Sequence, residues 1–522
     1  MEKENVTAAK MIVSLVFGGF LVIFLLFFSD LFLKARRRRS RLEKQGIKGP
    51  LPSLFYGNIP EMKRIIGLEN EKSRDREDIV HGWFHTVFPH LEQWRNEYGP
   101  TFLYSAGNIQ ILCITDPEMA KEVSLCTSLN LGKPSYLSTD RGPLLGRGIL
   151  SSNGQYWVHQ RKIIAPQFYL DKVKGMVNLM AESTLAMLKT WENKIESWGG
   201  KVKITVDEDL RSLSADIISR ACFGSSYTEG ELIFTKLHAL QRTMSKGNFN
   251  VGVPGLRYLP TKHNKEIWKL EAEINAKILQ VVKCCSTGDN NKKNLVQLLL
   301  SAAESYGDDS NIPADITPKK FIVDNCKNIY FAGHETTAIS ASWCLMTLAA
   351  YPEWQTRARQ EVLQICGTNI PTAEMLRNMK VLTTIILETL RLYPPVAYVV
   401  REALEDIHFK EIHIPKGINI QIPIPIMHHR RDLWGPDAHQ FEPDRFANGI
   451  SGACRIPQAY MPFGMGTRIC AGQNFAMTEL KLILSLILSK FSFSLSPEYR
   501  HSPVFGLVVQ PQHGVNILLR KI

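Results

Sequence analysis

The ten residues 463–472, FGMGTRICAG, constrain the fold of this chain more than any other stretch. They place Cys470 two residues after Arg468, among three glycines and just before an apolar segment, 473–490, with helical spacing. If a helix begins there, its free backbone N–H groups favour a thiolate. The glycines let the backbone pass close to something bulky and flat, and the guanidinium suits a carboxylate. A lone cysteine is usually a core residue, but this neighbourhood favours a thiolate ligand.

An uncharged apolar run near the N-terminus is the second constraint. Residues 11–28 carry no charge, and the apolar character continues to Leu33, which is long enough to cross a bilayer as a helix. The next segment, 34–48, holds eight basic side chains against Glu43 alone. The positive-inside rule therefore predicts an uncleaved single-pass anchor with the rest of the chain in the cytosol. A cleaved signal peptide is the alternative, but the basic block follows the apolar run and no small-residue cleavage site ends it.

The formal net charge of +12 does not indicate nucleic-acid binding, because the tract at 34–48 contributes most of it. A basic tract beside an anchor attracts anionic lipid head groups. Ten cysteines are present without a CxxC pair. This scattered spacing, together with the cytosolic orientation, argues against disulfides and against a zinc site.

Helical periodicity dominates the rest of the chain, and strand-like alternation is confined to short segments. Helices are expected over 170–196, 318–350, 372–392 and 473–490, and strand pairs over 101–115 and 408–422. The fold class is therefore mostly α with small β-sheets (α+β). We expect an N-terminal membrane anchor at 1–33, a basic juxtamembrane tract with a Pro/Gly hinge at 34–58, and one globular domain at 59–522.

The string FGMGTRICAG closely resembles the haem-binding signature of the cytochrome P450 family, F-G-x-G-x-R-x-C-x-G, and every fixed position is present. The resemblance implies a cytochrome P450 fold and a haem b group whose iron is bound by the Cys470 thiolate. Such a ligand pushes electron density to the iron and favours O–O cleavage. Phe463, Gly464 and Gly472 would surround the haem, and Arg468 would meet a propionate.

A second motif, FAGHETT at 331–337, lies in the middle of a long apolar segment. Taken alone, it fits a loosely packed core helix with a charged residue turned toward water. It also resembles the A-G-x-[DE]-T-T oxygen-activation motif of the P450 family. The resemblance implies that Glu335 and Thr336 are a catalytic acid–alcohol pair that relays protons. His334 occupies a variable position of the motif and receives no role.

Glu388 and Arg391 of ETLRLYPP are three residues apart on a predicted helix, which in most proteins is an ordinary surface ion pair. In the P450 family this E-x-x-R pair joins a downstream arginine, and FEPDRF offers Arg445. The family usually has glutamate where this chain has Asp444. The resemblance implies that Glu388, Arg391 and Arg445 support the haem pocket without taking part in catalysis.

Three more side chains resemble family positions that contact the haem propionates. Trp157 and Arg161 of WVHQR match the W-x-x-x-R helix, and Arg401 matches an arginine that follows the ETLRLYPP helix. Each alone is more commonly a surface residue. Together with Arg468 they are expected to form a propionate clamp.

The resemblance implies an NADPH- and O2-dependent monooxygenase that uses a separate NADPH-cytochrome P450 reductase. No complete G-x-G-x-x-G or Walker sequence is present, so NADPH and flavins are expected to act only through that partner. The anchor and the separate reductase together predict a single-pass protein of the endoplasmic reticulum membrane with its catalytic domain in the cytosol.

Four strings, LPSLFYGNIPEM, YGPTFLYSAG, MHHRRDLWGPDA and QPQHGV, resemble plant P450s of clan seventy-two, in the branch with gibberellin oxidases and pentacyclic triterpenoid acid oxidases. The leading expectation is hydroxylation, in one or several successive oxidations, of a pentacyclic triterpenoid acid of the oleanane or ursane type. A gibberellin oxidase is the alternative. A haem-thiolate isomerase or dehydratase and a non-enzymatic haem sensor are remote alternatives.

By family resemblance, six residues are expected to line the substrate cavity: Ile329, Phe331, Val396, Val399, Val400 and Phe505. The glycine-containing segment 129–149 is consistent with a mobile lid over the haem. Arg141 or Arg147 in this segment is a candidate partner for a substrate carboxylate, with a propionate contact or plain solvation as the alternatives.

Overall fold

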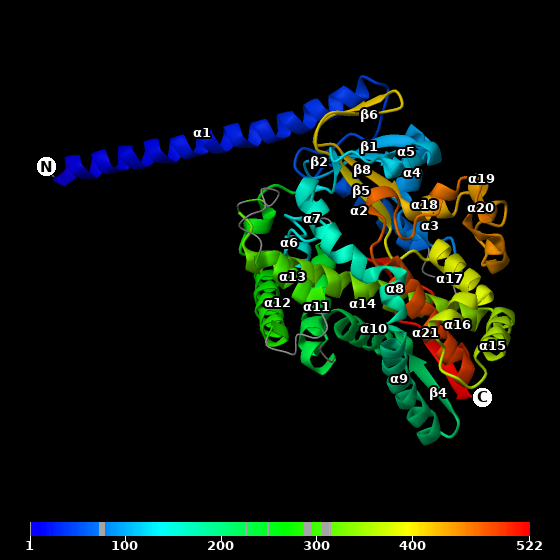
Figure 1. The fold of residues 1–522 in the computed structure, drawn as a ribbon. Helices are drawn as coiled ribbons and strands as arrows, with labels where there is room; N and C mark the ends of the chain where they lie inside the picture. The colour runs from blue at the N-terminus through cyan, green and yellow to red at the C-terminus, as the bar shows by residue number, and fades with distance from the viewer. Residues whose placement is uncertain are drawn as a thin grey trace.

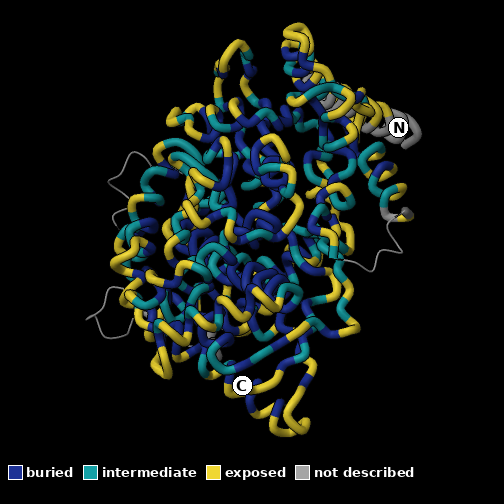
Figure 2. The backbone as a smooth tube through the Cα atoms, turned by 90° about the vertical axis from the view of Figure 1, so that its right-hand side faces the viewer, coloured by how far each residue is buried: buried dark blue, intermediate teal, exposed yellow. Residues whose placement is uncertain are grey.

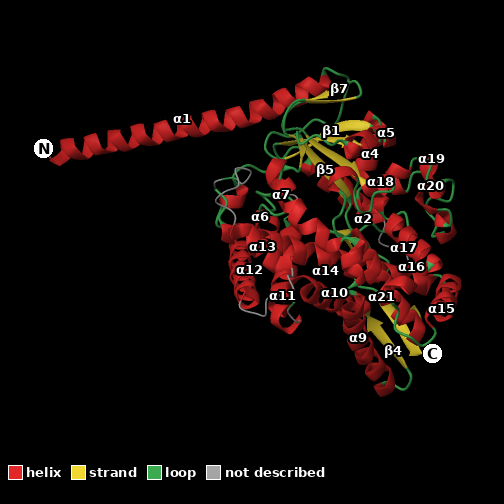
Figure 3. Ribbon diagram, in the orientation of Figure 1, coloured by secondary structure: helices red, strands yellow, loops and turns green. Residues whose placement is uncertain are grey.

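The computed structural model describes residues 2–72, 79–224, 227–247, 250–286, 295–304, 313 and 315–522. This part of the chain is mostly helical, with four small sheets, as the sequence predicts (Figures 1 and 3). The α-helices are α1 (Glu2–Glu43), α2 (Ile59–Lys72), α3 (Phe84–Val87), α4 (Pro89–Tyr98), α5 (Pro117–Leu125), α6 (Gly142–Leu145), α7 (Gly154–Ile164), α8 (Leu170–Lys174), α9 (Val177–Ser197), α10 (Val206–Phe223), α11 (Tyr227–Lys246), α12 (Lys262–Ser286), α13 (Leu295–Glu304), α14 (Pro318–Ala350), α15 (Pro352–Cys366), α16 (Ala373–Asn378), α17 (Lys380–Leu392), α18 (Ile424–His428), α19 (Arg431–Trp434), α20 (Gly449–Ala453) and α21 (Gln473–Lys490).

Short 3₁₀ helices connect several of these elements: η1 (Ser135–Leu137), η2 (Ala165–Phe168), η4 (Leu256–Tyr258), η6 (Pro443–Phe446), η7 (Pro457–Ala459) and η8 (Gly466–Arg468). The strands are β1 (Thr101–Ala106), β2 (Ile109–Ile114), β3 (Leu131–Gly132), β4 (Lys201–Thr205), β5 (Tyr398–Ala403), β6 (Ile407–Phe409), β7 (Ile412–Ile414), β8 (Asn419–Pro423), β9 (Phe491–Leu495), β10 (Pro503–Phe505), β11 (Val509–Pro511) and β12 (Asn516–Lys521).

Helix α14 runs through the middle of the molecule, packed on α10 (Figure 1). Pro318 occupies its first turn, and the Thr317 side chain accepts a hydrogen bond from the Lys320 backbone N–H, so sequence signals define where the helix begins. A Cβ added at Gly333 would lie 2.7 Å from a carbon of Ile218 on α10. Gly333 therefore lets the two helices pack closely, which offsets its poor helix propensity.

The largest sheet has the strand order β1-β2-β8-β5-β3, in which β2 and β8 are parallel and the other pairs antiparallel. Residues alternate between its two faces, because successive side chains of a strand point in opposite directions. Along β5 the burial alternates from residue to residue. One face packs on a separate hydrophobic cluster that includes Leu103, Leu112 and Val399.

Helix α1 extends away from the body, and only its C-terminal turns are docked (Figures 1 and 2). Ala35, Arg39 and Leu42 are buried, and the Arg39 guanidinium donates to the backbone carbonyls of Gly49 (3.2 Å) and Pro50 (2.9 Å). The end of the basic tract is thus part of the globular body. The segment expected as a hinge is also attached to it.

Among the helices of the described part of the chain, none meets the length and hydrophobicity that a membrane crossing requires. The anchor predicted at 1–33 falls mostly on residues whose side chains lie outside the described part of the structure.

Candidate active site

The loop before α21 presents Cys470 as the sequence predicts. Its backbone N–H donates to the carbonyl of Phe463 (2.8 Å), which closes the loop, and α21 begins three residues later. Gly464 and Gly466 both have a φ of +68°. A Cβ at Gly466 would lie 2.2 Å from the Ser124 carbonyl oxygen, so only glycine fits there.

The Cys470 side chain is exposed, yet the surrounding protein is dense enough to raise the pKa of its thiol. A hydrogen bond from the Gly472 backbone and the positive charge of Arg161 oppose this effect of burial. The Cys470 thiol is accessible to solvent but has protein atoms densely packed around it, so it lies in a recess of the protein. Burial outweighs these two groups in its effect on the pKa, but Arg161 and the Gly472 backbone are the groups that would stabilise a thiolate bound to a metal.

Three arginines gather around this loop. Arg468 donates to the Ser152 carbonyl (2.9 Å) and to Asn153 Oδ1 (3.1 Å), and its guanidinium lies 4.1 Å from the centre of the Trp157 ring. Arg161 donates to the carbonyl of the residue before Cys470 (2.8 Å). Arg401, on β5, is 5% exposed, and within the described residues it donates only to the neighbouring Val400 carbonyl (2.9 Å).

These cations lack carboxylate partners within the described residues. Burial, with the charges of Arg401 and Arg161, lowers the pKa of Arg468 to about 9. Burial lowers the pKa of Arg401 to about 10. Lys133 joins the cluster, because burial and the charges of Arg401 and Arg468 bring its pKa well below the usual range. Buried cations that repel one another indicate that an anion belongs between them.

Four residues interrupt the burial of α14. Within the segment 321–349, all residues are buried except Phe331, Ala332, Gly333 and Thr336. The Thr336 hydroxyl donates to the Ala332 carbonyl (2.7 Å), one turn earlier in the same helix. The expected oxygen-activation motif is therefore the least buried part of α14, called the open part below, and Phe331 of this part lines the cavity described below.

The Glu335 side chain lies against α10 and α11, whereas the Thr336 hydroxyl bonds within α14. Its carboxylate is wholly buried and accepts a hydrogen bond from Arg211 Nε (3.2 Å), while its other oxygen lies 3.4 Å from His334 Nε2 and 3.8 Å from His238 Nδ1. Burial alone would raise its pKa, but His238, His334 and Arg211 outweigh burial and hold the pKa at about 2. The structure places no hydrogen bond between the two members of the expected acid–alcohol pair.

Glu388, Arg391 and Arg445 come together as the resemblance implies. Arg391 donates to both Glu388 oxygens at 2.7 Å, and Arg445 Nε lies 3.6 Å from Glu388 Oε1. Glu388 and Arg391 are completely buried, so the ordinary surface ion pair is the wrong interpretation. Asp444 forms a surface ion pair with Arg357 (3.0 Å), so the departure from the family pattern lies outside this cluster.

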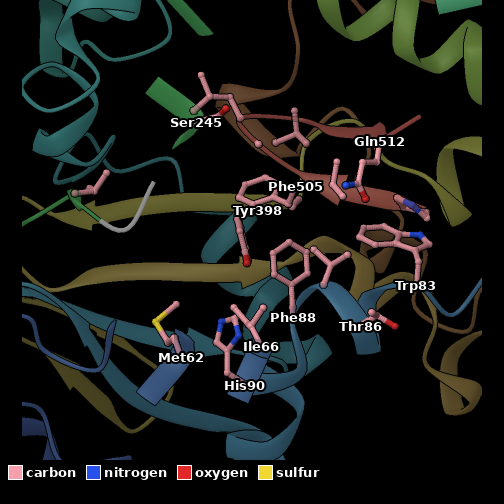
Figure 4. Close-up of a pocket in the computed structure, with 18 of the residues that line it drawn as sticks. Met62, Ile66, Trp83, Thr86, Phe88, His90, Ser245, Tyr398, Phe505 and Gln512 are labelled. Atoms are coloured by element: carbon pink, nitrogen blue, oxygen red, sulfur yellow. The ribbon is translucent and has the colours of Figure 1, made fainter. Parts of the chain in front are cut away.

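A cavity of about 2110 Å³ opens between the large sheet, α2, α4, α14 and the C-terminal segment (Figure 4). Four of the residues expected to line it do so: Phe331, Val396, Val400 and Phe505. Aromatic side chains that the sequence did not single out, among them Trp83, Phe88 and Tyr398, line it as well.

Two expected lining residues, Ile329 and Val399, lie outside the lining. Ile329 is 6% exposed and belongs to the hydrophobic core. Val399 points to the opposite face of the sheet from Tyr398 and Val400, because side chains alternate along β5.

A chain of hydrogen bonds supports one wall of the cavity. His81 bonds through Nδ1 to the Tyr393 hydroxyl (2.6 Å) and through Nε2 to the Tyr351 hydroxyl (2.7 Å). Tyr393 also bonds to His501 (3.2 Å), which bonds to Tyr499 (2.9 Å). Because Tyr499 and His501 line the cavity, the chain fixes its C-terminal wall to the core.

The segment expected as a mobile lid is fastened to α14. Asp324 accepts a hydrogen bond from the Arg147 backbone N–H (2.9 Å), and Asn328 Oδ1 accepts one from the Leu150 backbone N–H (2.8 Å). The Arg147 guanidinium pairs with Asp315 (2.7 Å), so it is not a partner for a ligand in the cavity. Arg141 does line the cavity, and it donates to the Met244 carbonyl (3.2 Å).

A sequence model of the family described as Cytochrome P450 matches residues 81–519. The chain belongs to the cytochrome P450 family. It is 51% identical over 496 residues to Cytochrome P450 714C2 of Oryza sativa subsp. japonica, covering 94% of each chain. It is 45% identical to Cytochrome P450 714B2 of the same rice, with 99% of this chain and 98% of the relative covered. Cytochrome P450 714A2 of Arabidopsis thaliana is 46% identical, with 92% and 93% covered.

This P450 is a monooxygenase that uses O2 and holds haem through a cysteine thiolate, with NADPH electrons supplied by a reductase. The residues fit the group: Cys470 is a recessed thiol before a helix, and the cluster of Lys133, Arg161, Arg401 and Arg468 suits two propionates. Sequence reasoning missed Lys133, because it lies between β3 and η1 in no recognisable motif.

Proposed function

We propose that this cytochrome P450 hydroxylates a plant terpenoid, in one or several successive oxidations, and that a pentacyclic triterpenoid acid is its leading substrate. The observation that supports this proposal is the cavity of about 2110 Å³, which is large enough for a polycyclic skeleton and carries many aliphatic and aromatic side chains, with polar and charged side chains among them. A rigid polycyclic hydrocarbon skeleton matches such a lining, because it loses little conformational freedom when it binds. The resemblance of the chain to clan seventy-two P450s also supports it.

Bound haem supplies oxygen activation, and the side chains of this protein hold the substrate and deliver protons. Thr336 lies on the open part of α14, where its hydroxyl is placed to donate a proton. Glu335 connects this region with Arg211 and His238, which are 20% and 32% exposed. We propose that Glu335 acts as the acid of the pair after it leaves the contacts with Arg211 and His238, which hold its pKa at about 2 in the present arrangement.

We also propose attachment to the endoplasmic reticulum membrane by a single pass through residues 11–28. The support for this proposal is the uncharged sequence of that segment and the basic tract that follows it. The docked end of α1 would then hold the catalytic domain at a fixed distance from the membrane surface.

Product analysis tests the substrate class. Microsomes that contain this chain and a plant reductase are given NADPH with oleanane acids, ursane acids and gibberellins together, and the products are identified by mass spectrometry. The proposal predicts oxygenated triterpenoid and unchanged gibberellin. Oxygenated gibberellin with unchanged triterpenoid would contradict the leading substrate and make the enzyme a hormone-modifying oxidase.

A further inference from the structure

One wall of the cavity carries a group of polar side chains that come from the large sheet and from α4. Asn419 and Gln421 lie two residues apart on β8 and therefore share a face of the sheet. Tyr398 lies on the adjacent strand β5, and His90 comes from α4. We call these four residues the polar wall; all of them line the cavity.

His90 and Tyr398 meet around one aromatic ring. The Phe88 ring centre lies 5.3 Å from that of Tyr398 and 6.4 Å from that of His90. Figure 4 shows the three side chains on the same side of the cavity. On the sheet, the Tyr104 hydroxyl donates to Gln421 Oε1, and both residues line the cavity. Tyr398 and Gln421 thus lie on neighbouring strands, β5 and β8, and Asn419 lies further along β8.

The hydrogen-bonding capacity of the polar wall is largely unused. His90 is 3% exposed and Asn419 is 7% exposed, and neither His90 Nδ1 nor Asn419 Oδ1 has a hydrogen-bond partner in the described part of the chain. The Tyr398 hydroxyl and the Gln421 amide nitrogen also make no hydrogen bond to a described residue. Buried polar groups without partners cost free energy, so several on one wall indicate a ligand that supplies the missing bonds.

All four groups are uncharged at neutral pH. Burial lowers the pKa of His90 to about 3 and raises the pKa of Tyr398 well above its usual range. The two amides do not titrate. The polar wall therefore offers neutral donors and acceptors and no cation. A carboxylate placed there would lose its hydration without gaining a countercharge, whereas a hydroxyl or a carbonyl group needs none.

We infer that the polar wall, His90, Tyr398, Asn419 and Gln421, binds an uncharged oxygen function, a hydroxyl or carbonyl group, on the terpenoid substrate. The inference rests on the proposed function and extends it. Under this inference, the polar wall binds an oxygen atom that the substrate skeleton already carries. The carbon that is oxidised is a different one and faces the open part of α14. A reaction that oxygenates the skeleton must therefore precede the one catalysed here.

The test is a binding titration of the haem-loaded enzyme, followed by the shift of its Soret band when a ligand enters. Two ligands are compared, a pentacyclic triterpenoid with a ring hydroxyl and the same compound without it. We expect His90→Phe and Asn419→Leu to weaken binding of the hydroxylated ligand roughly three- to tenfold. Binding of the deoxy ligand should not weaken, because it makes no such hydrogen bond.

Two further variants separate recognition from folding. Thr86→Val removes a hydroxyl elsewhere in the lining and should leave both affinities unchanged. His90→Asn keeps a neutral donor and acceptor and should restore part of the preference for the hydroxyl. The ferrous carbon monoxide spectrum of each variant reports whether the haem site is intact.

The outcomes distinguish the inference from the proposed function. Equal weakening of both ligands, or no weakening of either, would overturn the inference and leave a terpenoid binder whose polar wall is merely hydrated. If neither terpenoid shifts the Soret band of the unmodified enzyme, the proposed function fails and the inference fails with it.

Discussion

At the residue scale, Thr336 and Glu335 are neighbours in sequence with different surroundings. The hydroxyl lies on the open part of α14, whereas the carboxylate is buried against Arg211 and His238. A proton relay that uses both residues requires the carboxylate to change its direction. The motif alone predicts which residues take part, but their relative positions depend on α10 and α11.

Replacing Thr336 with alanine tests the relay. The hydroxyl donates only within its own helix, so Thr336→Ala should fold normally. We expect NADPH consumption to continue while product formed per NADPH falls at least severalfold. Ser340→Ala is the matched control, because the Ser340 hydroxyl makes the same type of bond, to the Thr336 carbonyl (2.8 Å), from a buried position. An unchanged product-to-NADPH ratio in Thr336→Ala would remove the assigned role.

Glu479 should make stability depend on pH. It is completely buried on α21, and burial raises its pKa to about 8 although Ser214 donates to it (2.6 Å). Because the folded protein holds this proton more tightly than the unfolded chain, the contribution is full below pH 4.5 and is lost as the pH rises toward 8.

Glu479→Gln should therefore raise the melting temperature at pH 8 and leave it nearly unchanged near pH 5. The gain at the higher pH is on the order of a few kcal/mol, since each pKa unit is worth about 1.4 kcal/mol. Thermal unfolding at both pH values measures it, with the exposed Glu498→Gln as control. A gain of the same size at both pH values would show that the carboxyl does not titrate as described.

At the element scale, the segment after η1 is fixed to α14 rather than free to open. Gly146 has a φ of +52°, and a Cβ there would lie 2.1 Å from Asp324 Oδ1. The glycines of this segment suggested mobility from sequence alone. Gly146 and Gly148 let the backbone approach α14 closely enough for Asp324 and Asn328 to bind it.

Gly146→Ala should destabilise the protein by roughly 2–4 kcal/mol, because it combines an unfavourable φ with a steric overlap. A Cβ at Gly142 meets nothing within 4 Å, so Gly142→Ala should change stability by less than about 0.5 kcal/mol. Chemical denaturation of both variants makes the comparison. Equal stabilities would mean that the contact with Asp324 is not formed.

Strand β5 shows how far sequence reasoning carries within one element. The family resemblance places the segment after α17 at the cavity, and Val400 does line it. Val399 does not, because only alternate side chains of the strand reach the cavity. Which alternate set faces inward is decided by the pairing of β5 with β8, and that pairing is not encoded in β5 itself.

At the scale of the whole molecule, site residues that lie together in one short motif could be predicted from the sequence. Site residues that come from distant segments, and are brought together only by the fold, could not. Cys470 and Arg468 belong to one sequence motif, and the E-x-x-R pair lies within one turn of a helix. The polar wall, in contrast, joins His90 to Asn419, more than 300 residues later. Asn419 is placed in the lining by the parallel pairing of β8 with β2, in which it lies opposite Ile111.

The docking of α1 makes a prediction for the whole chain. Deleting residues 2–33 should move the protein from the membrane to the soluble fraction while its haem spectrum stays intact. Deleting residues 2–43 should also lower stability by several kcal/mol, because Ala35, Arg39 and Leu42 are buried on the body. Ultracentrifugation and thermal unfolding measure the two effects. A shorter deletion that remains on the membrane would contradict the proposed anchor.

The central claim is that Cys470 and the cavity together make this chain a terpenoid monooxygenase. The most direct test supplies isotopically labelled dioxygen, reductase and NADPH to the unmodified enzyme and to Cys470→Ala, with a pentacyclic triterpenoid acid as substrate, and measures the product mass. We predict one labelled oxygen atom per hydroxylation with the unmodified enzyme and no labelled product with Cys470→Ala. Unlabelled product, or labelled product from Cys470→Ala, would contradict the account.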